Sequence, residues 1–387
     1  MTIELDPKAN TAATQIWSSP EVAVIVPTFN ERDNVVSLFD LVSKAMGDIP
    51  FEFIVVDDNS PDGTAGVVKE LARRHANVRC IHRIGRRGLS SAVIEGISAS
   101  AAPYFAVIDA DHQHDERILP LMLDKALAGN HIVVGTRYAS GGQVGEGLSK
   151  TREAGSRLAT QLSGLVTGRA LSDPMSGFFL MRRDVFDEIA PSLSSEGFKI
   201  LLDIIVSAGR ARARRGKELR IGEVPYTFRP RNAGESKMSS IVVVQFLGLV
   251  LSKMTGGLLP PTFLMFAFVG GLGVLVNLAV LGVAGHLLDV HDTGAFAKAQ
   301  VIATVIAMVF NFALNNELTY ANKKLRGWRW VTGLVTFCAV CSIGAIASVS
   351  VGTWIYAWDK SFWLAGIAGV LMSVVFNYSV TRVFTWR

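Results

Sequence analysis

The sequence predicts two parts: an α/β domain with a doubly wound, mostly parallel sheet, followed by a domain of four membrane-spanning helices. Half of the 387 residues are apolar and 18% are charged, which excludes a disordered chain. Short apolar strands alternate with amphipathic helices up to about residue 135. The density of charged residues falls in the second half: residues 1–240 hold 29 basic and 29 acidic side chains, whereas residues 241–387 hold 9 basic and 4 acidic ones.

This charge balance limits the partners of the protein. The first 240 residues sum to zero, so the whole formal net charge of +5 lies in the apolar second half. A small positive excess among apolar segments is typical of loops that orient membrane helices. The sequence therefore indicates a lipid bilayer as a partner and no nucleic acid. Residues 1–19 are polar, lack a signal-peptide core and are expected to form a flexible N-terminus.

Hydrophobic periodicity locates the elements of the α/β domain. Strands are expected at residues 21–29, 51–56, 78–82, 104–108 and 132–135, and helices at 34–46, 64–75, 90–99 and 117–128. Polar segments come at the ends of these strands, namely PTFNE, DDNSPD, DADHQ and GTRY. Ligands of such sheets collect at the carboxyl ends of the strands, so this placement is the first indication of a binding site.

The segment DADHQ carries the clearest chemistry. Asp109 and Asp111 follow a buried strand and, with the amide oxygen of Gln113, offer hard oxygen ligands for Mg²⁺ or Mn²⁺. In isolation, two aspartates at this spacing are more often solvated loop residues. Their position after a strand, in series with the other polar segments, favours a site for a metal and a diphosphate.

A second carboxylate pair ends the strand at residues 51–56. Asp57 or Asp58 can accept hydrogen bonds from a nucleotide base or ribose there, and turn capping is the competing interpretation. Pro27, Phe29 and Glu31 could form the wall and the polar, hydrogen-bonding group of a pocket for a base, although an isolated phenylalanine is more often part of a core.

Basic residues lie on several loops around the same edge. Arg152 and Ser156 are four residues apart, so they share one face of a helix, and arginine with a hydroxyl is a phosphate-binding pair. Each arginine alone is most often a solvated charge, but several around one site indicate phosphate binding. The basic run at 210–220 is expected to be a solvated or membrane-surface face. Further arginines on these loops are Arg137, Arg229 and Arg231.

Six motifs occur in the order IVPTFNE, VVDDNSPDG, DADHQHD, GTRY, SDPMSGFF and EVPYTFRPRNAGESK. Over about residues 20–240, this series resembles the polyprenyl-phosphate glycosyltransferases of glycosyltransferase family 2, closest to the dolichol-phosphate mannose synthases. The resemblance implies a GT-A fold at residues 20–235 and transfer of a sugar from a nucleotide-sugar donor to a polyprenyl or dolichyl phosphate.

The resemblance also assigns roles to residues. The nucleotide would be held by Pro27, Phe29, Glu31, Val56 and Asp58. The metal and the diphosphate would be held by Asp109, Ala110, Asp111 and Gln113. The donor phosphates would be lined by Arg137, Arg229, Arg231 and Lys237. The acceptor phosphate would be gripped by Arg152 and Ser156. The expected catalytic set is Asp111, Arg137, Arg152, Ser156, Arg229 and Arg231.

The chemistry of the acceptor predicts the reaction course. A lipid phosphate monoester carries roughly −1.5 to −2 charges at pH 7 and is already a nucleophile. The reaction then needs positioning and stabilisation of the leaving diphosphate rather than a strong base. We expect single-step inversion, with a hexose, foremost mannose from GDP-mannose, becoming β-linked to the lipid phosphate. The alternatives are a UDP-glucose:polyprenyl phosphate glucosyltransferase and a lipid-linked sugar flippase with a regulatory soluble domain.

The second half is long and apolar enough for four spans. They are expected at about residues 263–288, 296–318, 330–354 and 362–384. Residues 236–258 are expected to hold interfacial juxtamembrane helices, since the apolar run there is too short to span. The link between the second and third spans carries Lys323, Lys324, Arg326 and Arg329, which predicts that this link, the C-terminus and the catalytic domain lie on the cytoplasmic side of a plasma or inner membrane.

Two spans end alike, at residues 310–320 and 376–386, which suggests a repeat of two-span units. The pattern of residues 259–387 resembles the GtrA-like four-span domains. Intramembrane asparagines, namely Asn277, Asn311, Asn315 and Asn377, are expected to hydrogen-bond between helices, with a lipid-headgroup lining as the alternative. Contacts in the membrane make a homo-oligomer possible, without an identifiable interface.

Overall fold

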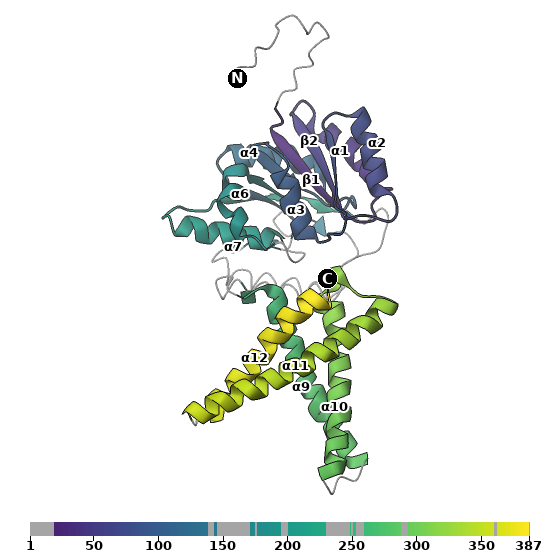
Figure 1. Cartoon of the computed structure of the whole chain (residues 1–387). Coiled ribbons are helices and arrows are strands. Elements are labelled where there is room, and N and C mark those ends of the chain that lie inside the picture. The colour runs from purple at the N-terminus through teal and green to yellow at the C-terminus, as the bar shows by residue number, and fades with distance from the viewer. Residues whose placement is uncertain are drawn as a thin grey trace, which may run out of the picture.

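The computed structural model describes residues 19–137, 143–144, 171–174, 176–194, 200–229, 248, 251–252, 259–287, 293–359 and 362–386. Figure 1 shows an α/β domain at one end and long helices at the other. The expected N-terminal segment and nearly all of the expected juxtamembrane segment at 236–258 lie outside the described residues.

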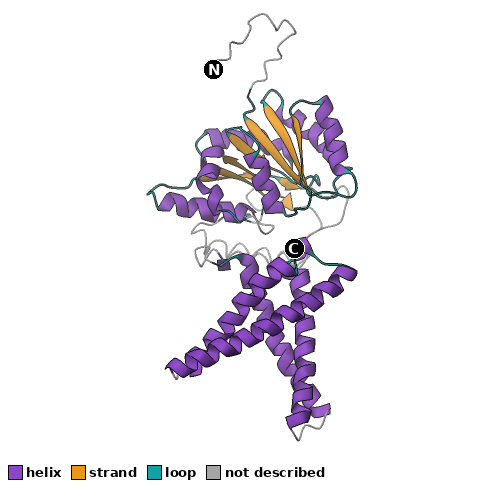
Figure 2. Cartoon of the chain, in the orientation of Figure 1, coloured by secondary structure: helices purple, strands orange, loops and turns teal. Residues whose placement is uncertain are grey.

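The described strands of the first domain form a seven-stranded sheet in the order β3-β2-β1-β4-β7-β5-β8 (Figure 2). The strands are β1 Val22–Thr28, β2 Phe51–Asp57, β3 Val78–His82, β4 Tyr104–Val107, β5 Ile132–Thr136, β7 Phe179–Arg182 and β8 Ile221–Pro225. Four of the six neighbouring pairings in this sheet are parallel, and β7 runs antiparallel to both β4 and β5. The predicted mostly parallel sheet is therefore confirmed, with one reversed strand.

Helices cover both faces of this sheet, which makes three layers. The helices are α1 Val35–Met46, α2 Thr64–Arg74, α3 Leu89–Ser98, α4 Leu119–Leu127, α6 Arg183–Ile189 and α7 Ile200–Ala213. One core lies under α1, α2 and α4, and the other under α3, α6 and α7. All seven residues of β1 are buried, as expected of a central strand with both faces covered.

The strand register brings the polar segments to one edge. In the parallel pairing of β1 with β2, Pro27 lies opposite Val56 and Thr28 opposite Asp57. In the pairing of β1 with β4, Ile25 lies opposite Val107, so the residues that follow β4 emerge beside the end of β1. A second, two-stranded parallel pairing joins β6 Gln143–Val144 to β9 Thr227–Phe228.

Four helices in the described part of the second domain are long and apolar enough to cross a membrane, as predicted. They are α9 Pro261–Leu287, α10 Thr293–Leu314, α11 Trp328–Asp359 and α12 Phe362–Phe384. A π-helix at Asn315–Thr319 continues α10. With 32 residues, α11 is about 48 Å long at 1.5 Å per residue, which is longer than a hydrocarbon core of about 30 Å.

The helices of this domain pack in two hairpins, α9 with α10 and α11 with α12, and each hairpin has the same asparagine-on-glycine contact. A Cβ on Gly273 of α9 would overlap the side chain of Asn311 on α10, and a Cβ on Gly344 of α11 would overlap Asn377 on α12. The expected hydrogen bonds between helices are wrong for these asparagines. Asn377 donates to Ser373 of its own helix at 3.3 Å, and the Oδ1 atoms of Asn311 and Asn377 have no partner among the described residues.

Asn316 makes the bonds between elements instead. Its Oδ1 accepts the backbone N–H of Leu325 at 2.8 Å and the indole N–H of Trp386 at 3.1 Å. Trp386 is fully buried and stacks on Tyr320, with ring centroids 4.1 Å apart. The basic link and the C-terminal end of α12 are thereby held together.

The glycine contacts generate a prediction about stability. Gly273→Ala places a methyl group in the α9–α10 contact, and we expect a loss of about 1–3 kcal/mol, the usual cost of overpacking. Gly270→Ala is the matched control, because a Cβ at Gly270 has nothing within 4 Å among the described residues. Thermal unfolding of both purified variants in detergent measures the difference. Equal melting temperatures for the two variants would contradict the contact.

Candidate active site

The two carboxylates at the end of β2 have different partners: Asp57 caps a turn, and Asp58 pairs with an arginine. Asp57 is fully buried and accepts hydrogen bonds from Thr28 Oγ1 at 3.2 Å and from the Ser60 backbone N–H at 3.0 Å. Its geometry is that of a turn cap, which is the competing interpretation of the sequence. Asp58 accepts Arg83 Nη1 at 2.6 Å and the Gly88 N–H at 2.7 Å.

Arg83 was not expected at this site, and it changes the electrostatics of Asp58. Burial raises the pKa of the Asp58 carboxyl, although the Gly88 N–H and the Arg83 guanidinium both act to lower it. Arg83 is itself only 2% exposed and also donates to Ser91 Oγ at 2.6 Å. The sequence signal was weak, because Arg83 simply follows β3 in a basic stretch.

The residues expected around a base lie along the ends of β1 and β2. Pro27 and Val56 are buried neighbours in the sheet, so Val56 can offer a ligand only its backbone. Phe29 is half-buried, and the Arg87 guanidinium lies over its ring at 4.4 Å from the centroid. Glu31 Oε2 accepts from Asn34 Nδ2 at 2.8 Å, which orients its carboxylate beside α1.

The segment after β4 presents its carboxylates through a strained turn. His112 has a φ of 61°, in the left-handed region, and its Nε2 lies 2.9 Å from Ser37 Oγ and 3.2 Å from the Asn34 carbonyl oxygen. Asp111 is buried and accepts the Gln113 N–H at 3.2 Å. Ala110 is also buried, so only its backbone is available to a ligand.

His114, which has no identifiable partner in the sequence, connects Asp109 to a tyrosine. His114 Nε2 lies 3.2 Å from Asp109 Oδ2, and its Nδ1 lies 2.7 Å from the Tyr226 hydroxyl oxygen. Burial raises the pKa of Tyr226 well above its ordinary value, so the phenol keeps its proton and donates to Nδ1. With Nδ1 accepting from the phenol, Nε2 carries a proton and donates it to the carboxylate, which orients Asp109.

A glycine and two aromatic rings complete this arrangement. A Cβ on Gly177 would lie 2.8 Å from Asp109 Oδ2, so a side chain there would displace the carboxylate. Phe178 and Phe228 lie beside the His114 ring, with centroids 5.2 Å and 5.9 Å away. The imidazole therefore has little room to turn.

Two of the predicted arginines are each held by buried carboxylates. Arg137 makes a paired contact with Asp173, at 2.7 Å from Nε and 3.0 Å from Nη2, and lies over the Phe228 ring. Asp173 is 1% exposed. Asp173 belongs to the motif SDPMSGFF, one of the six that carry the family resemblance, but the resemblance assigns no role to this residue.

Arg229 is held next to the acidic segment. Its Nη2 donates to Asp115 Oδ1 at 2.7 Å and its Nη1 to Glu116 Oε2 at 2.9 Å. Burial acts to raise the pKa of Asp115, but hydrogen bonds from Arg117 and the charge of Arg229 hold it below its ordinary value. The backbone N–H of Arg229 also donates to the Gln113 carbonyl oxygen at 2.9 Å, which fixes the backbone of this arginine beside the DADHQ segment.

Four predicted residues, Arg152, Ser156, Arg231 and Lys237, lie outside the described residues. The expectation for the basic run at 210–220 is wrong at Arg212, which is buried and contacts His131 Nε2 at 2.9 Å. Arg212 also forms an ion pair with Glu188, at 3.7 Å. Arg212 therefore joins α7 to β5 and α6 instead of facing solvent or lipid.

The oxygen donors after β4 fit a hard divalent cation. Asp109 and Asp111 supply carboxylates and Gln113 an amide oxygen, the ligand types that Mg²⁺ and Mn²⁺ prefer. Among the described residues, no group of three or more His, Cys, Asp and Glu side chains is placed to hold a metal ion by itself. A set with few protein ligands suits a metal that shares its coordination with substrate phosphates.

Comparisons with known proteins agree with this organisation. The model of glycosyl transferase family 2 matches residues 23–190, and the model of the GtrA/DPMS transmembrane domain matches residues 265–386. Among solved structures, glucosyl-3-phosphoglycerate synthase from Mycobacterium tuberculosis in complex with Mn²⁺ and uridine diphosphate is 17% identical. The alignment covers 61% of this chain and 80% of that chain, with a TM-score of 0.45.

Curated relatives are more similar to the chain in sequence than this structure is. A dolichol-phosphate mannosyltransferase of Pyrococcus furiosus is 32% identical over 95% of this chain and 99% of its own length. A dolichol-phosphate mannosyltransferase of Saccharomyces cerevisiae is 38% identical over 59% of this chain and 85% of its own length. The chain therefore belongs to the dolichol-phosphate mannosyltransferase family, as a membrane-embedded glycosyltransferase that joins a family 2 catalytic domain to a GtrA/DPMS transmembrane domain.

Proposed function

We propose that this enzyme transfers mannose from GDP-mannose to a polyprenyl phosphate, with inversion and with the help of Mg²⁺ or Mn²⁺. The observation that carries the proposal is that Arg229, which follows β9, donates its backbone N–H to the Gln113 carbonyl oxygen. A cation for a diphosphate thereby lies beside the oxygen donors of Asp109, Asp111 and Gln113 after β4. The similarity to the Pyrococcus furiosus mannosyltransferase over nearly the whole chain supports the choice of sugar.

Each group of residues has a distinct role in this proposal. Asp109, Asp111 and Gln113 hold the metal, which neutralises charge on the donor diphosphate when bound. The backbone of Ala110 lies against the same phosphates. The nucleotide lies against Pro27, Phe29, Glu31, Val56 and Asp58. The cations near the leaving diphosphate are Arg137, Arg229, Arg231 and Lys237.

The acceptor phosphate needs orientation more than activation. We place it on Arg152 and Ser156, whose guanidinium and hydroxyl are suited to a phosphate dianion. Since the acceptor is already nucleophilic, its oxygen attacks the anomeric carbon as the bond to the diphosphate breaks, and an α-linked donor gives a β-linked product. The basic link between α10 and α11 favours a cytoplasmic catalytic domain and C-terminus in a plasma or inner membrane.

The direct test incubates the purified protein with polyprenyl phosphate, Mg²⁺ or Mn²⁺ and a panel of radiolabelled nucleotide-sugars. We expect lipid-soluble label from GDP-mannose, β-linked by NMR, and loss of transfer on chelation of the metal. Preferential labelling from UDP-glucose would support a glucosyltransferase instead. An α-linked product would exclude single-step inversion.

Asp111 provides a sharper test of the metal site. Asp111→Asn keeps the shape of the side chain but removes its charge, so we expect transfer to fall by roughly 10²–10³-fold with unchanged membrane insertion. Asp124→Asn makes the same change on the exposed face of α4 and serves as the control. Wild-type turnover in Asp111→Asn would remove this residue from the site.

The Tyr226–His114–Asp109 chain predicts a second effect. Tyr226→Phe removes the donor to His114 Nδ1, so the imidazole proton is no longer held on Nε2, the nitrogen that faces Asp109. We expect Mn²⁺ affinity to fall by about 10–100-fold, as for other residues that orient metal ligands. Electron paramagnetic resonance of Mn²⁺ measures this without turnover, and Tyr104→Phe on β4 is the matched control. Unchanged Mn²⁺ affinity would show that the hydroxyl does not orient Asp109.

A further inference from the structure

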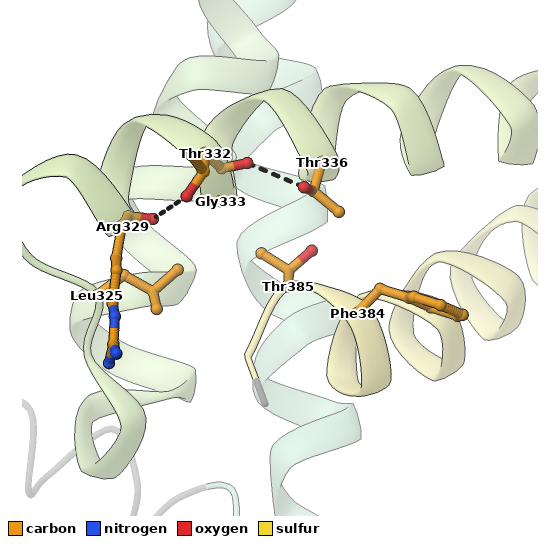
Figure 3. Close-up of a pocket in the computed structure, with 7 residues that line it drawn as sticks. All are labelled: Leu325, Arg329, Thr332, Gly333, Thr336, Phe384 and Thr385. Atoms are coloured by element: carbon orange, nitrogen blue, oxygen red, sulfur yellow. Dashed lines mark hydrogen bonds between the residues drawn. The ribbon is translucent and has the colours of Figure 1, made fainter.

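A pocket of about 340 Å³ opens between the start of α11 and the end of α12 (Figure 3). Figure 1 shows that this end of the helical domain faces the catalytic domain. The lining of the pocket combines a cation, hydroxyl groups and apolar surface. The residues used below are Leu325, Arg329, Thr332, Thr336, Phe384 and Thr385.

The hydroxyl of Thr385 is the least expected feature of the pocket. Thr385 is 6% exposed, and its Oγ1 has no hydrogen-bond partner among the described residues. The other two hydroxyls are satisfied within α11, since Thr332 donates to the Arg329 carbonyl oxygen at 3.2 Å and Thr336 to the Thr332 carbonyl oxygen at 2.9 Å. A buried hydroxyl without a partner destabilises a protein, so a polar ligand group at Thr385 would relieve that cost.

Arg329 supplies the charge. Its side chain is exposed at the mouth of the pocket, and within the described part of the chain no carboxylate pairs with it. Lys324 in the same link, by contrast, forms an ion pair with Glu317 at 2.6 Å. The pocket therefore has one cation available for an anionic ligand.

The walls of the pocket are held in place before any ligand binds. Asn316 bonds the backbone of Leu325 on one wall and the indole of Trp386, the residue after Thr385, on the other. Phe384 is 55% exposed and extends the pocket as an apolar surface along α12. A ligand that fits has a polar head at the membrane surface and a hydrocarbon tail.

We propose that this pocket binds the headgroup of an anionic phospholipid, with Arg329 facing the phosphodiester, Thr385 donating its hydroxyl to a headgroup oxygen, and Phe384 against the start of an acyl chain. Basic pockets between helices at the membrane surface bind such headgroups. One guanidinium matches the single negative charge of a phosphodiester, whereas the monoester of a polyprenyl phosphate carries up to about two. None of the residues that line the pocket is among those proposed for the donor and the acceptor, so the inference does not depend on the proposed function.

The experiment measures lipid binding to the full-length protein in uncharged detergent, by native mass spectrometry and by the rise in melting temperature. We expect phosphatidylglycerol to bind at least about tenfold more tightly than phosphatidylcholine. Arg329→Gln and Thr385→Val should each weaken the binding of phosphatidylglycerol by about tenfold or more. Arg326→Gln is the matched control, because it removes the same charge from the same link without lining the pocket.

For Thr385→Val, the melting temperature without lipid also tests whether the variant is folded. Because it replaces an unpartnered buried hydroxyl with a methyl group, its melting temperature without lipid should equal or exceed that of the wild type. The proposal is overturned if Arg326→Gln weakens binding as much as Arg329→Gln, or if Thr385→Val binds phosphatidylglycerol normally. It is also overturned if inorganic phosphate stabilises the protein equally, or if polyprenyl phosphate displaces phosphatidylglycerol at a lower concentration.

Discussion

The antiparallel placement of β7 between β4 and β5 is the constraint on which the active-site edge depends. Because Phe179 at the start of β7 lies opposite Val107 at the end of β4, the segment that enters β7 lies beside the segment that leaves β4. This brings Gly177 against Asp109 and places Asp173 beside Arg137, which follows β5. A parallel β7 would carry these residues to the opposite edge of the sheet. One reversed strand therefore supplies the site with its buried anchors.

A second constraint is that the cations at this edge are already paired with carboxylates. Arg137 is held by Asp173, Arg229 by Asp115 and Glu116, and Arg83 by Asp58. A guanidinium group that is already paired loses little further conformational freedom when a phosphate binds. Before a phosphate binds, the carboxylates also reduce the repulsion between the neighbouring arginines. The equal numbers of acidic and basic residues in positions 1–240 are a consequence of this arrangement as well as of an ordinary charged surface.

In the membrane domain, single polar residues decide how apolar helices meet. Lipid gives no hydrophobic preference for one helix face over another, so close packing on glycine and hydrogen bonds become the selective contacts. Asn311 and Asn377 occupy equivalent positions of the repeat and pack on Gly273 and Gly344. Asn316 instead joins the basic link to the C-terminal end of α12, and the pocket beside Thr385 is a consequence of that junction.

The sequence by itself determined the division into an α/β domain and a membrane domain, the strands from β1 to β5, the four long helices and the position of the DADHQ segment after β4, because hydrophobic periodicity and charge density are local properties. Periodicity could not reveal that β7 is reversed, since strand direction depends on pairing between distant segments. Nor could it pair Arg229 with Glu116, 113 residues apart, or His114 with Tyr226, 112 residues apart. Only the tertiary structure decided which charges neutralise each other and that the hydroxyl of Thr385, in the pocket, has no partner among the described residues.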